Sequence, residues 1–433
     1  MEKTALSKAL FIAGVAAISS MPALAEKPTS DFEFHGYFRA GALTSAKNDF
    51  KQHEWGGQKE TLGRLGLEAD DFWELAFMQR WDWEKSEDSD GKSVRINARL
   101  GQDNPNGNGS NLFANIDGKA AGLIESFVEF DGVSNTGTLW GGQRYYGRDN
   151  YIFMTDFFYT DYSGTGIGLK GTELAGGKWD FAYIASNQSL GLNEMLNAFH
   201  VRADYGQWRI EGMAKQMGEN VNGDEFSTSG FEGHVQYSPS NFFGFANGFS
   251  KIGVQYGQGL GGSTMLGRTF TNYNQFSPGG AGFNPDAVVG QTNMTRVKDG
   301  DQTVRAQAYG GYIGENWLFF PAVGYEQTSY DDNVDDFSYW YAMVRPVYTM
   351  PSIDDFAIAA EFGYTDNSVN RDNGGNATYK ATIAPTWTVG TGFGPAPEIR
   401  LLATYLKGNP GVSSNAGEDD HDFIVGVQVD MWW

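Results

Sequence analysis

The chain ends on the stretch DFIVGVQVDMWW (residues 422–433), whose alternation of side chains indicates the fold class. Successive side chains of a β-strand point to opposite faces, so every second residue shares a face. One face of this stretch is apolar throughout and carries Phe423, Val425, Val427, Val429, Met431 and Trp433. The other face mixes polar and apolar residues: Asp422, Ile424, Gly426, Gln428, Asp430 and Trp432. The pattern is typical of a barrel strand between lipid and water, although a half-buried soluble sheet would also show it.

Many strands of this kind follow one another along the chain. The first is FEFHGYFRAGA (residues 32–42), again about ten residues long with a period of two. Further candidates lie near 60–84, 93–101, 122–130, 137–147, 166–174, 178–187, 197–204, 207–216, 230–238, 248–257, 303–313, 317–328, 337–348, 355–364, 377–389 and 397–407. Turn-forming clusters such as Gly176-Gly177 separate them. The sequence therefore predicts an all-β chain of about eighteen strands.

The N-terminus predicts export from the cytoplasm. Lys3 and Lys8 precede an apolar stretch, residues 9–18, that is too short to cross a membrane as a helix. The following Ala23-Leu24-Ala25 is typical of a signal-peptide cleavage site. We therefore expect residues 1–25 to be a cleaved signal peptide and residues 26–433 to form one domain. Because no later segment has 18 consecutive apolar residues, the exported chain is either an outer-membrane barrel or a soluble periplasmic or secreted protein.

Composition favours the barrel. The 58 glycines, 12 tryptophans, 21 tyrosines and 31 phenylalanines suit tight turns and two aromatic girdles at the membrane interfaces. The long polar connectors at 102–118 and 258–302 are typical of extracellular loops and suit a compact soluble domain poorly. The net charge of −22 argues against nucleic-acid binding, and the absence of cysteine excludes thiolate chemistry. The five histidines lack metal-ligand spacing, and we expect no metal or cofactor.

Three aromatic rings occupy faces that are otherwise polar. Tyr37 lies among Glu33, His35 and Arg39, Phe72 lies on the face of Glu74, and Trp432 lies on that of Asp430. If the apolar faces meet lipid, these rings face the water of the pore, where a sugar ring could stack on them. The alternative is that they pack beneath a loop folded into the barrel, and the periodicity leaves both readings open.

Several motifs together resemble the maltoporin family, the carbohydrate-specific trimeric porins of Gram-negative outer membranes. They are FHGYFR (34–39), RLG (64–66) with Glu74-Leu75, LWGGQRYY (139–146), MTDFFY (154–159) with Ser163-Gly164, and GVQVDMWW (426–433). The resemblance implies an 18-stranded antiparallel transmembrane β-barrel, a homotrimer in outer-membrane lipid, and a third loop folded inward as a constriction. It also implies an aromatic slide beside a polar track, so that the chain is a channel and not an enzyme.

The resemblance also implies which residues would contact the sugar. Slide positions correspond to Tyr37, Phe72, Trp432, Phe249, Phe393 and Phe113. Polar-track or constriction positions correspond to Arg39, Arg64, Glu74, Arg148, Asp149, Asn150, Asp156 and Phe158. The chain departs from the family pattern in four ways. Phe158 replaces a Tyr, Ile124 aligns near a track Arg, and Phe393 stands at a slide position that is commonly Trp. One extra residue also makes Asp149 and Asn150 compete for a single track position.

The expected function is facilitated diffusion of maltose, maltodextrins or related oligosaccharides, including sucrose-type disaccharides. A periplasmic sugar-binding protein is a further expected partner. One alternative is a nonselective diffusion porin, which would conduct ions without being blocked by sugar. The other alternative is a periplasmic β-rich carbohydrate-binding protein or glycoside hydrolase, the latter with a pair of carboxylates across a cleft.

Overall fold

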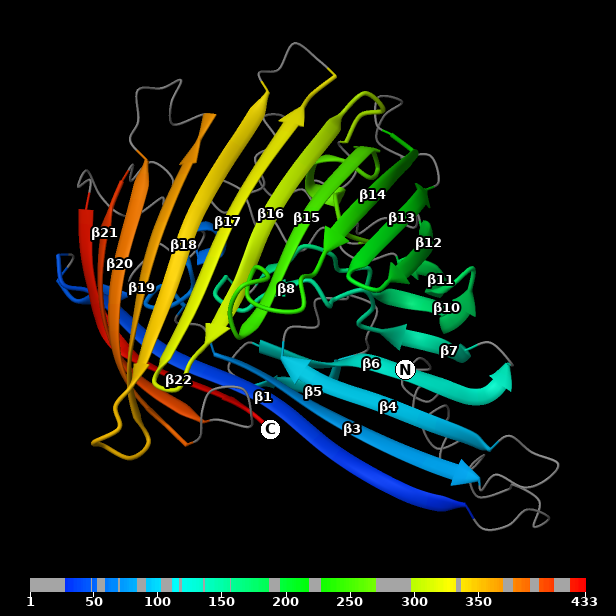
Figure 1. Ribbon diagram of the computed structural model, residues 1–433, viewed down its shortest axis with the longest axis horizontal. Coiled ribbons are helices and arrows are strands. Elements are labelled where there is room, and N and C mark those ends of the chain that lie inside the picture. The colour runs from blue at the N-terminus through cyan, green and yellow to red at the C-terminus, as the bar shows by residue number, and fades with distance from the viewer. Residues whose placement is uncertain are drawn as a thin grey trace.

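The computed structural model forms one large barrel of strands (Figure 1). It describes residues 28–47, 49–52, 59–68, 71–83, 91–102, 111–116, 119–134, 137–155, 157–186, 195–217, 227–269, 297–331, 336–368, 377–389, 397–408 and 421–433. The expected signal peptide lies outside the described residues. No helix in the described part of the chain is both long enough and apolar enough to span a membrane.

Eighteen long strands form the wall of the barrel. They are β1 (Thr29–Ser45), β3 (Phe72–Trp83), β4 (Lys92–Gln102), β6 (Lys119–Ser134), β7 (Gly137–Arg144), β10 (Gly164–Leu174), β11 (Gly177–Ser186), β12 (Leu196–Tyr205), β13 (Trp208–Gln216), β14 (Ser229–Tyr237), β15 (Gly248–Gly259), β16 (Gln302–Ile313), β17 (Trp317–Ser329), β18 (Phe337–Thr349), β19 (Phe356–Asn367), β20 (Thr378–Thr388), β21 (Glu398–Lys407) and β22 (His421–Trp432). Shorter elements lie in the connections: β2 (Lys51–Gln52), α2 (Lys59–Leu62), β5 (Asn111–Ile116), β8 (Tyr151–Ile152), β9 (Phe157–Phe158) and the 3-10 helix η2 (Ser263–Met265).

The wall closes because β1 pairs with both the second and the last of these strands. Residues 29–39 of β1 are antiparallel to β3, and residues 37–45 are antiparallel to β22. The remaining wall strands each pair antiparallel with their neighbours in the chain. Closure leaves no strand edge open to aggregation. The predicted eighteen-stranded antiparallel barrel is therefore confirmed.

One predicted strand, 60–84, is too long. Its strand portion, β3, begins only at Phe72, whereas residues 59–68 form the single-turn helix α2 and a tight turn. Gly63 and Gly66 have positive φ values of 90° and 74°, a conformation that few other residues adopt without strain. Arg64, which the resemblance places on the polar track, therefore lies in this inward turn and not on a strand.

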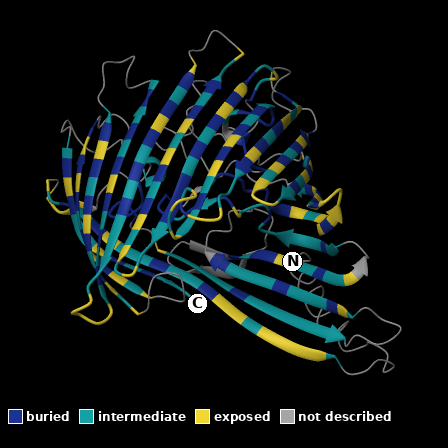
Figure 2. Cartoon of the chain, in the orientation of Figure 1, coloured by how far each residue is buried: buried dark blue, intermediate teal, exposed yellow. Residues whose placement is uncertain are grey.

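Burial alternates along the strands as the sequence predicts (Figure 2). Along β18, Tyr339, Tyr341 and Met343 face the interior and are buried, while Trp340 between them is exposed on the outside. Exposed apolar side chains cover the outer face at Ile167, Phe199, Ile210, Val254, Val323, Phe362, Ile383, Ile399 and Val427. This outer surface is the apolar band that a membrane barrel presents to lipid.

Aromatic pairs lie near both ends of the wall. Trp317 and Tyr348 are cross-strand partners near one end, with ring centroids 4.7 Å apart. Trp340 and Tyr364 lie near the opposite end, with centroids 4.4 Å apart. Amphipathic rings at these heights suit the two membrane–water interfaces, as the aromatic content of the sequence suggested.

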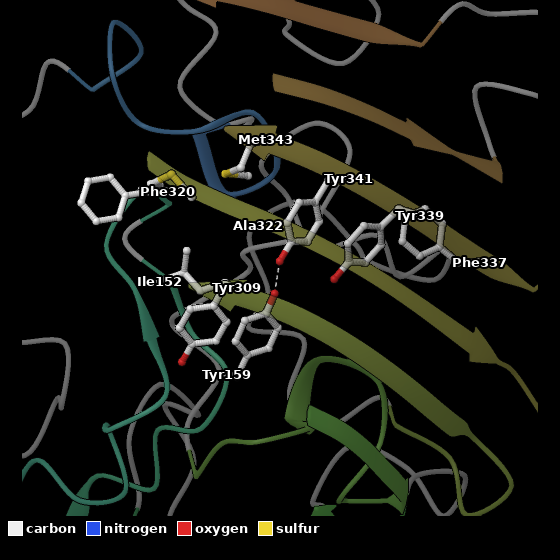
Figure 3. Close-up of a cluster of buried hydrophobic side chains, with 10 residues drawn as sticks. Ile152, Tyr159, Tyr309, Phe320, Ala322, Phe337, Tyr339, Tyr341 and Met343 are labelled. Carbon is white, nitrogen blue, oxygen red and sulfur yellow. Dashed lines mark hydrogen bonds between the residues drawn. The ribbon is translucent and has the colours of Figure 1, made fainter. Parts of the chain in front are cut away.

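The third long connection at one end of the barrel folds inward, as expected. This constriction loop, residues 145–163, joins β7 to β10 and contains β8 and β9. Ile152, Met154 and Tyr159 of the loop are buried against the inner faces of β16, β17 and β18 (Figure 3). The hydroxyls of Tyr159 and Tyr341 are hydrogen-bonded across this contact. Apolar packing therefore fixes the loop to the wall opposite its own strands.

Two more described segments fold inward. The first inward segment, residues 59–68, packs α2 against β18, β19 and β20. The second inward segment, residues 260–269, lies against the constriction loop, where the amide of Asp161 donates to the carbonyl of Gly267 over 2.7 Å. The first part of the predicted connector 258–302 is therefore hydrogen-bonded to the constriction loop. Residues 270–296 lie outside the described part.

Candidate functional site

A cavity of about 450 Å³ lies inside the barrel. It is lined by the inner faces of β1 and β17 to β22, by the first inward segment and by the constriction loop. Its aromatic lining comprises Tyr37, Tyr151, Phe153, Phe320 and Trp432, and its charged lining comprises Arg64, Arg345, Glu398, Arg400 and Asp430. The volume falls within the range of roughly 300–1,000 Å³ that small-molecule sites occupy. Aromatic rings and charged side chains thus line one cavity.

The three rings that the sequence singled out are brought together. Tyr37 and Trp432 are cross-strand partners on β1 and β22, and both line the cavity. Phe72, on β3, lies with its ring centroid 5.9 Å from that of Tyr37. The guanidinium of Arg39 sits 5.0 Å from the Phe72 centroid. Register alone explains this group, because β1 is hydrogen-bonded to β22 on one side and to β3 on the other.

Arg64 joins the rings to the charged groups. Its Nη2 donates to the hydroxyl of Tyr37 over 2.9 Å and lies 3.4 Å from an oxygen of Asp430. The same guanidinium is 2.5 Å from the buried carboxylate of Glu68. Its Nη1 lies 3.4 Å from the hydroxyl of Tyr151 on the constriction loop. Arg64 therefore contacts groups from β1, β22 and the constriction loop.

Glu68 is the buried counter-charge beneath Arg64. Its carboxylate is also 2.9 Å from Nζ of Lys59 and 3.4 Å from Nη1 of Arg39. Burial by itself would raise the pKa of Glu68, but Arg64, Lys59 and Arg39 outweigh it and hold that pKa well below its usual range. The carboxylate is therefore ionised at neutral pH and keeps the Arg64 guanidinium oriented.

Strands β18 and β21 supply two arginines of the cavity lining that we did not predict. Arg400 donates to Gln428 over 2.9 Å and is paired with Glu398, and Arg345 lies 2.6 Å from Glu361. Arg345 and Arg400 occupy the polar faces of the predicted strands 337–348 and 397–407. The same alternation that identified Tyr37 could therefore have found them.

Two predicted track or constriction residues, Arg148 and Phe158, lie in one stacked column, and a third, Glu74, is hydrogen-bonded to it. The guanidinium of Arg148 lies between the rings of Tyr145 and Phe158, 3.8 Å and 3.9 Å from their centroids. Phe158 stacks in turn on Tyr151, with centroids 4.5 Å apart. The hydroxyl of Tyr145 donates to Glu74 on β3 over 2.8 Å. Contacts with Arg148 and Tyr151 hold the Phe158 ring without the hydroxyl that a Tyr would supply.

The structure separates the two competing acidic-track candidates. The Asp149 carboxylate contacts Arg209 and lies 3.2 Å from Arg202, and it remains 42% exposed. Burial opposes its ionisation, but Arg209 and Arg202 outweigh that effect and lower the pKa of Asp149. Asn150 is fully buried and donates to Thr160 over 3.2 Å within the loop. Of the two, only Asp149 presents a charge to the lumen.

None of the remaining predicted slide and track positions that the structure describes lies in the cavity lining. Phe249 lies on β15 and packs against the aromatic cluster that holds the constriction loop, away from the cavity lining. Asp156, Phe393 and the side chain of Phe113 lie outside the described residues. Among the residues that are described, no three His, Asp or Glu side chains are grouped to hold a metal ion.

Known proteins similar to this chain are porins. The family model of the LamB porins matches residues 32–433. A maltoporin of Vibrio cholerae serotype O1 is 27% identical over 447 residues and covers 100% of both chains. A maltoporin of Hahella chejuensis is 27% identical over 438 residues, with 99% of each chain covered.

Solved structures similar to the chain are outer-membrane proteins. OprD of Pseudomonas aeruginosa matches with a TM-score of 0.45 and 11% identity, covering 95% of both chains. OccAB2 of Acinetobacter baumannii matches with a TM-score of 0.46 and 9% identity, covering 93% of this chain and 98% of its own.

Proposed function

We propose that this chain, which belongs to the LamB porin family, is a sugar-selective channel for maltose, maltodextrins or related oligosaccharides. Membership of that family makes the chain a multi-pass β-barrel of the outer membrane and a channel for solutes. The periplasmic alternative, a carbohydrate-binding protein or glycoside hydrolase, is therefore wrong. The nonselective diffusion porin remains as the competing function.

One observation carries the proposal: Tyr37 and Trp432 line the same cavity as Arg64 and Asp430. The apolar C–H face of a pyranose can stack on an aromatic ring, while charged neighbours bond its hydroxyls. A pore that merely filters by size has no need of rings held beside paired charges in its lumen. The cavity therefore supports selection by sugar chemistry.

In the proposed mechanism a sugar moves down its concentration gradient. It lays one face on Trp432 and Tyr37 and exchanges its hydroxyl contacts among Arg64, Asp430 and Arg400. Each stacking contact is worth about 0.5–1.5 kcal/mol, which allows weak binding and rapid release. Selective conduction requires both, because a solute that binds tightly would block the channel.

The proposal extends to assembly and partners. The active form is a homotrimer embedded in outer-membrane lipid, as the resemblance to the maltoporins implies. On the periplasmic side of the outer membrane, a sugar-binding protein would receive the transported sugar. Chemical cross-linking of the purified protein, followed by mass measurement, tests the trimer directly.

Recording from the protein in a planar lipid bilayer tests the function. We expect maltose, maltotriose, sucrose or raffinose to reduce the ion current in a saturable way, and the sugar with the lowest half-blocking concentration identifies the preferred substrate. An ohmic current that none of these sugars reduces would instead identify a nonselective diffusion porin.

A further inference from the structure

Two buried lysine–glutamate pairs on the inner wall share one geometry. Glu361 and Lys380 lie on β19 and β20, and Lys215 and Glu232 lie on β13 and β14. In each pair the two residues are diagonal neighbours on adjacent strands. The Nζ–Oε distances are 2.5 Å for Lys380 and 3.1 Å for Lys215, and both lysine side chains are 0% exposed. We refer to these pairs as the first clasp and the second clasp.

The first clasp holds the backbone on both sides of Arg64. Nζ of Lys380 donates to the carbonyls of Gly63 and Leu65 over 2.5 Å and 2.8 Å. The carboxylate of Glu361 accepts from the amide of Leu65 over 3.0 Å. The three ammonium donors of Lys380 thus all have acceptors, two of which are in the first inward segment. The backbone that carries Arg64 is fixed at the residue before it and the residue after it.

Glycine lets this segment lie directly against the wall. A Cβ added to Gly66 would lie 1.9 Å from Oγ1 of Thr404, and one added to Gly63 would lie 2.2 Å from a carboxylate oxygen of Glu361. Because both glycines also have positive φ, another residue at either site would push the segment away from the wall. The close approach brings the two carbonyls within reach of Lys380.

The first clasp itself does not line the cavity. Lys380 and Glu361 are not part of the cavity lining, whereas Arg64 and Leu65, and Arg345, which pairs with Glu361, are. A buried ion pair is weak evidence for stability, since a well-packed apolar replacement is often neutral. A role in positioning the segment accounts better for a lysine with two backbone acceptors.

We infer that Lys380 and Glu361 are positioning residues for sugar binding, which fix Arg64 against Tyr37 and Asp430 without touching the sugar. This inference rests on the proposed function, because Arg64 must contact the sugar for its position to matter. Without the first clasp the guanidinium would sample several orientations, and each binding event would have to restore the productive one.

The second clasp offers a matched control within the same molecule. Nζ of Lys215 donates to the carbonyl of Met265 over 2.7 Å, and the amide of Gly267 donates to Glu232 over 2.7 Å. Both lysine–glutamate pairs are buried and both hold the backbone of an inward segment, although Lys215 binds one carbonyl where Lys380 binds two. The second inward segment, residues 260–269, contributes no described residue to the cavity lining. Loss of the second clasp therefore reports the general effect of losing a buried pair.

The experiment compares Lys380→Met with Lys215→Met in the planar bilayer. For Lys380→Met we expect the half-blocking sugar concentration to rise about tenfold, the equivalent of one charge-assisted hydrogen bond. For Lys215→Met we expect the half-blocking sugar concentration to change by less than about twofold, because mutations at sites that do not contact each other are coupled only weakly. Glu361 remains paired with Arg345 in the first variant, so its charge is not left unpaired. Equal effects of the two variants would overturn the inference.

A double-mutant cycle separates positioning from general damage. If Lys380 acts through Arg64, adding Lys380→Met to Arg64→Ala produces no further loss of block, whereas independent effects would multiply and refute the inference. Gly66→Ala displaces the segment without removing a polar group, and we expect it to match Lys380→Met even if the lysine variant inserts poorly. A wild-type channel that no sugar blocks would refute the proposed function, and the inference with it. If sugar blocks the wild-type channel and the Lys380→Met variant has the same half-blocking concentration, only the inference is refuted and the proposed function stands.

Discussion

Trp432 and Trp433 are adjacent in the chain but lie on opposite faces of the barrel wall. Trp432 lines the cavity, whereas the ring of Trp433 packs on Phe34, with centroids 5.6 Å apart, and covers Gly36 on the outer face. Trp432→Ala removes one stacking surface from the cavity, worth about 0.5–1.5 kcal/mol. We therefore expect the half-blocking sugar concentration to rise roughly two- to twelvefold. Trp433→Ala removes a ring of the same size without changing the cavity.

Current recordings on Trp432→Ala and Trp433→Ala test whether the inward-facing ring binds sugar. For Trp433→Ala we expect sugar block equal to that of the wild type, and any change should appear instead in the thermal stability of the barrel. Tyr37→Ala, which removes the cross-strand partner of Trp432, should weaken block by a similar factor to Trp432→Ala. If Trp433→Ala weakened block as much as Trp432→Ala, or if Trp432→Ala left it unchanged, the reasoning that the inward rings bind sugar would be refuted.

Three further outcomes follow from the contacts around the cavity. Because the pKa of Glu68 lies well below its usual range, the carboxylate stays charged at mildly acidic pH. Its stabilising contribution is complete above the usual Glu pKa and is lost progressively as the pH falls from there through the lowered pKa. Sugar block should therefore be constant from pH 7 to about pH 5, and a midpoint near pH 5–6 in the bilayer would contradict this. Glu68→Gln should weaken block at pH 7, since it removes the charge opposite Arg64. Arg148→Ala removes the cation between the rings of Tyr145 and Phe158, so the constriction loop loses about 1 kcal/mol of stacking. We expect the open-channel current noise to increase. Noise identical to that of the wild type would show that the stacked column does not restrain the loop.

Local patterns in the sequence were sufficient to predict the strands of the barrel wall. The side-chain alternation of a strand repeats every two residues, so it can be recognised within about ten residues without knowledge of their partners. For this reason the strand count and the outward face of 422–433 could be predicted. The same local rule identified Tyr37 and Trp432, and the resemblance to the maltoporins then identified both as slide positions.

The rule failed where the chain leaves the wall. Residues 59–68 have polar residues at strand-like spacing, but Gly63 and Gly66 turn the backbone and the segment packs against β18, β19 and β20. Whether a connection folds inward depends on acceptors and donors far away in the sequence. Lys380 is 317 residues from Gly63, whose carbonyl it binds. The side-chain alternation within a segment cannot predict such a contact, because it depends only on neighbouring residues.

The sequence by itself determined an exported, eighteen-stranded barrel with an apolar exterior and several rings on its polar interior. Only the tertiary structure decided which of those rings meet, because Tyr37 and Trp432 come from opposite ends of the chain and become neighbours when the barrel closes. It also decided that Arg64 contacts both Tyr37 and Asp430, since buried contacts from β19 and β20 hold its backbone in place. Strand formation depends on neighbouring residues, whereas the lining of the cavity depends on closure of the whole wall.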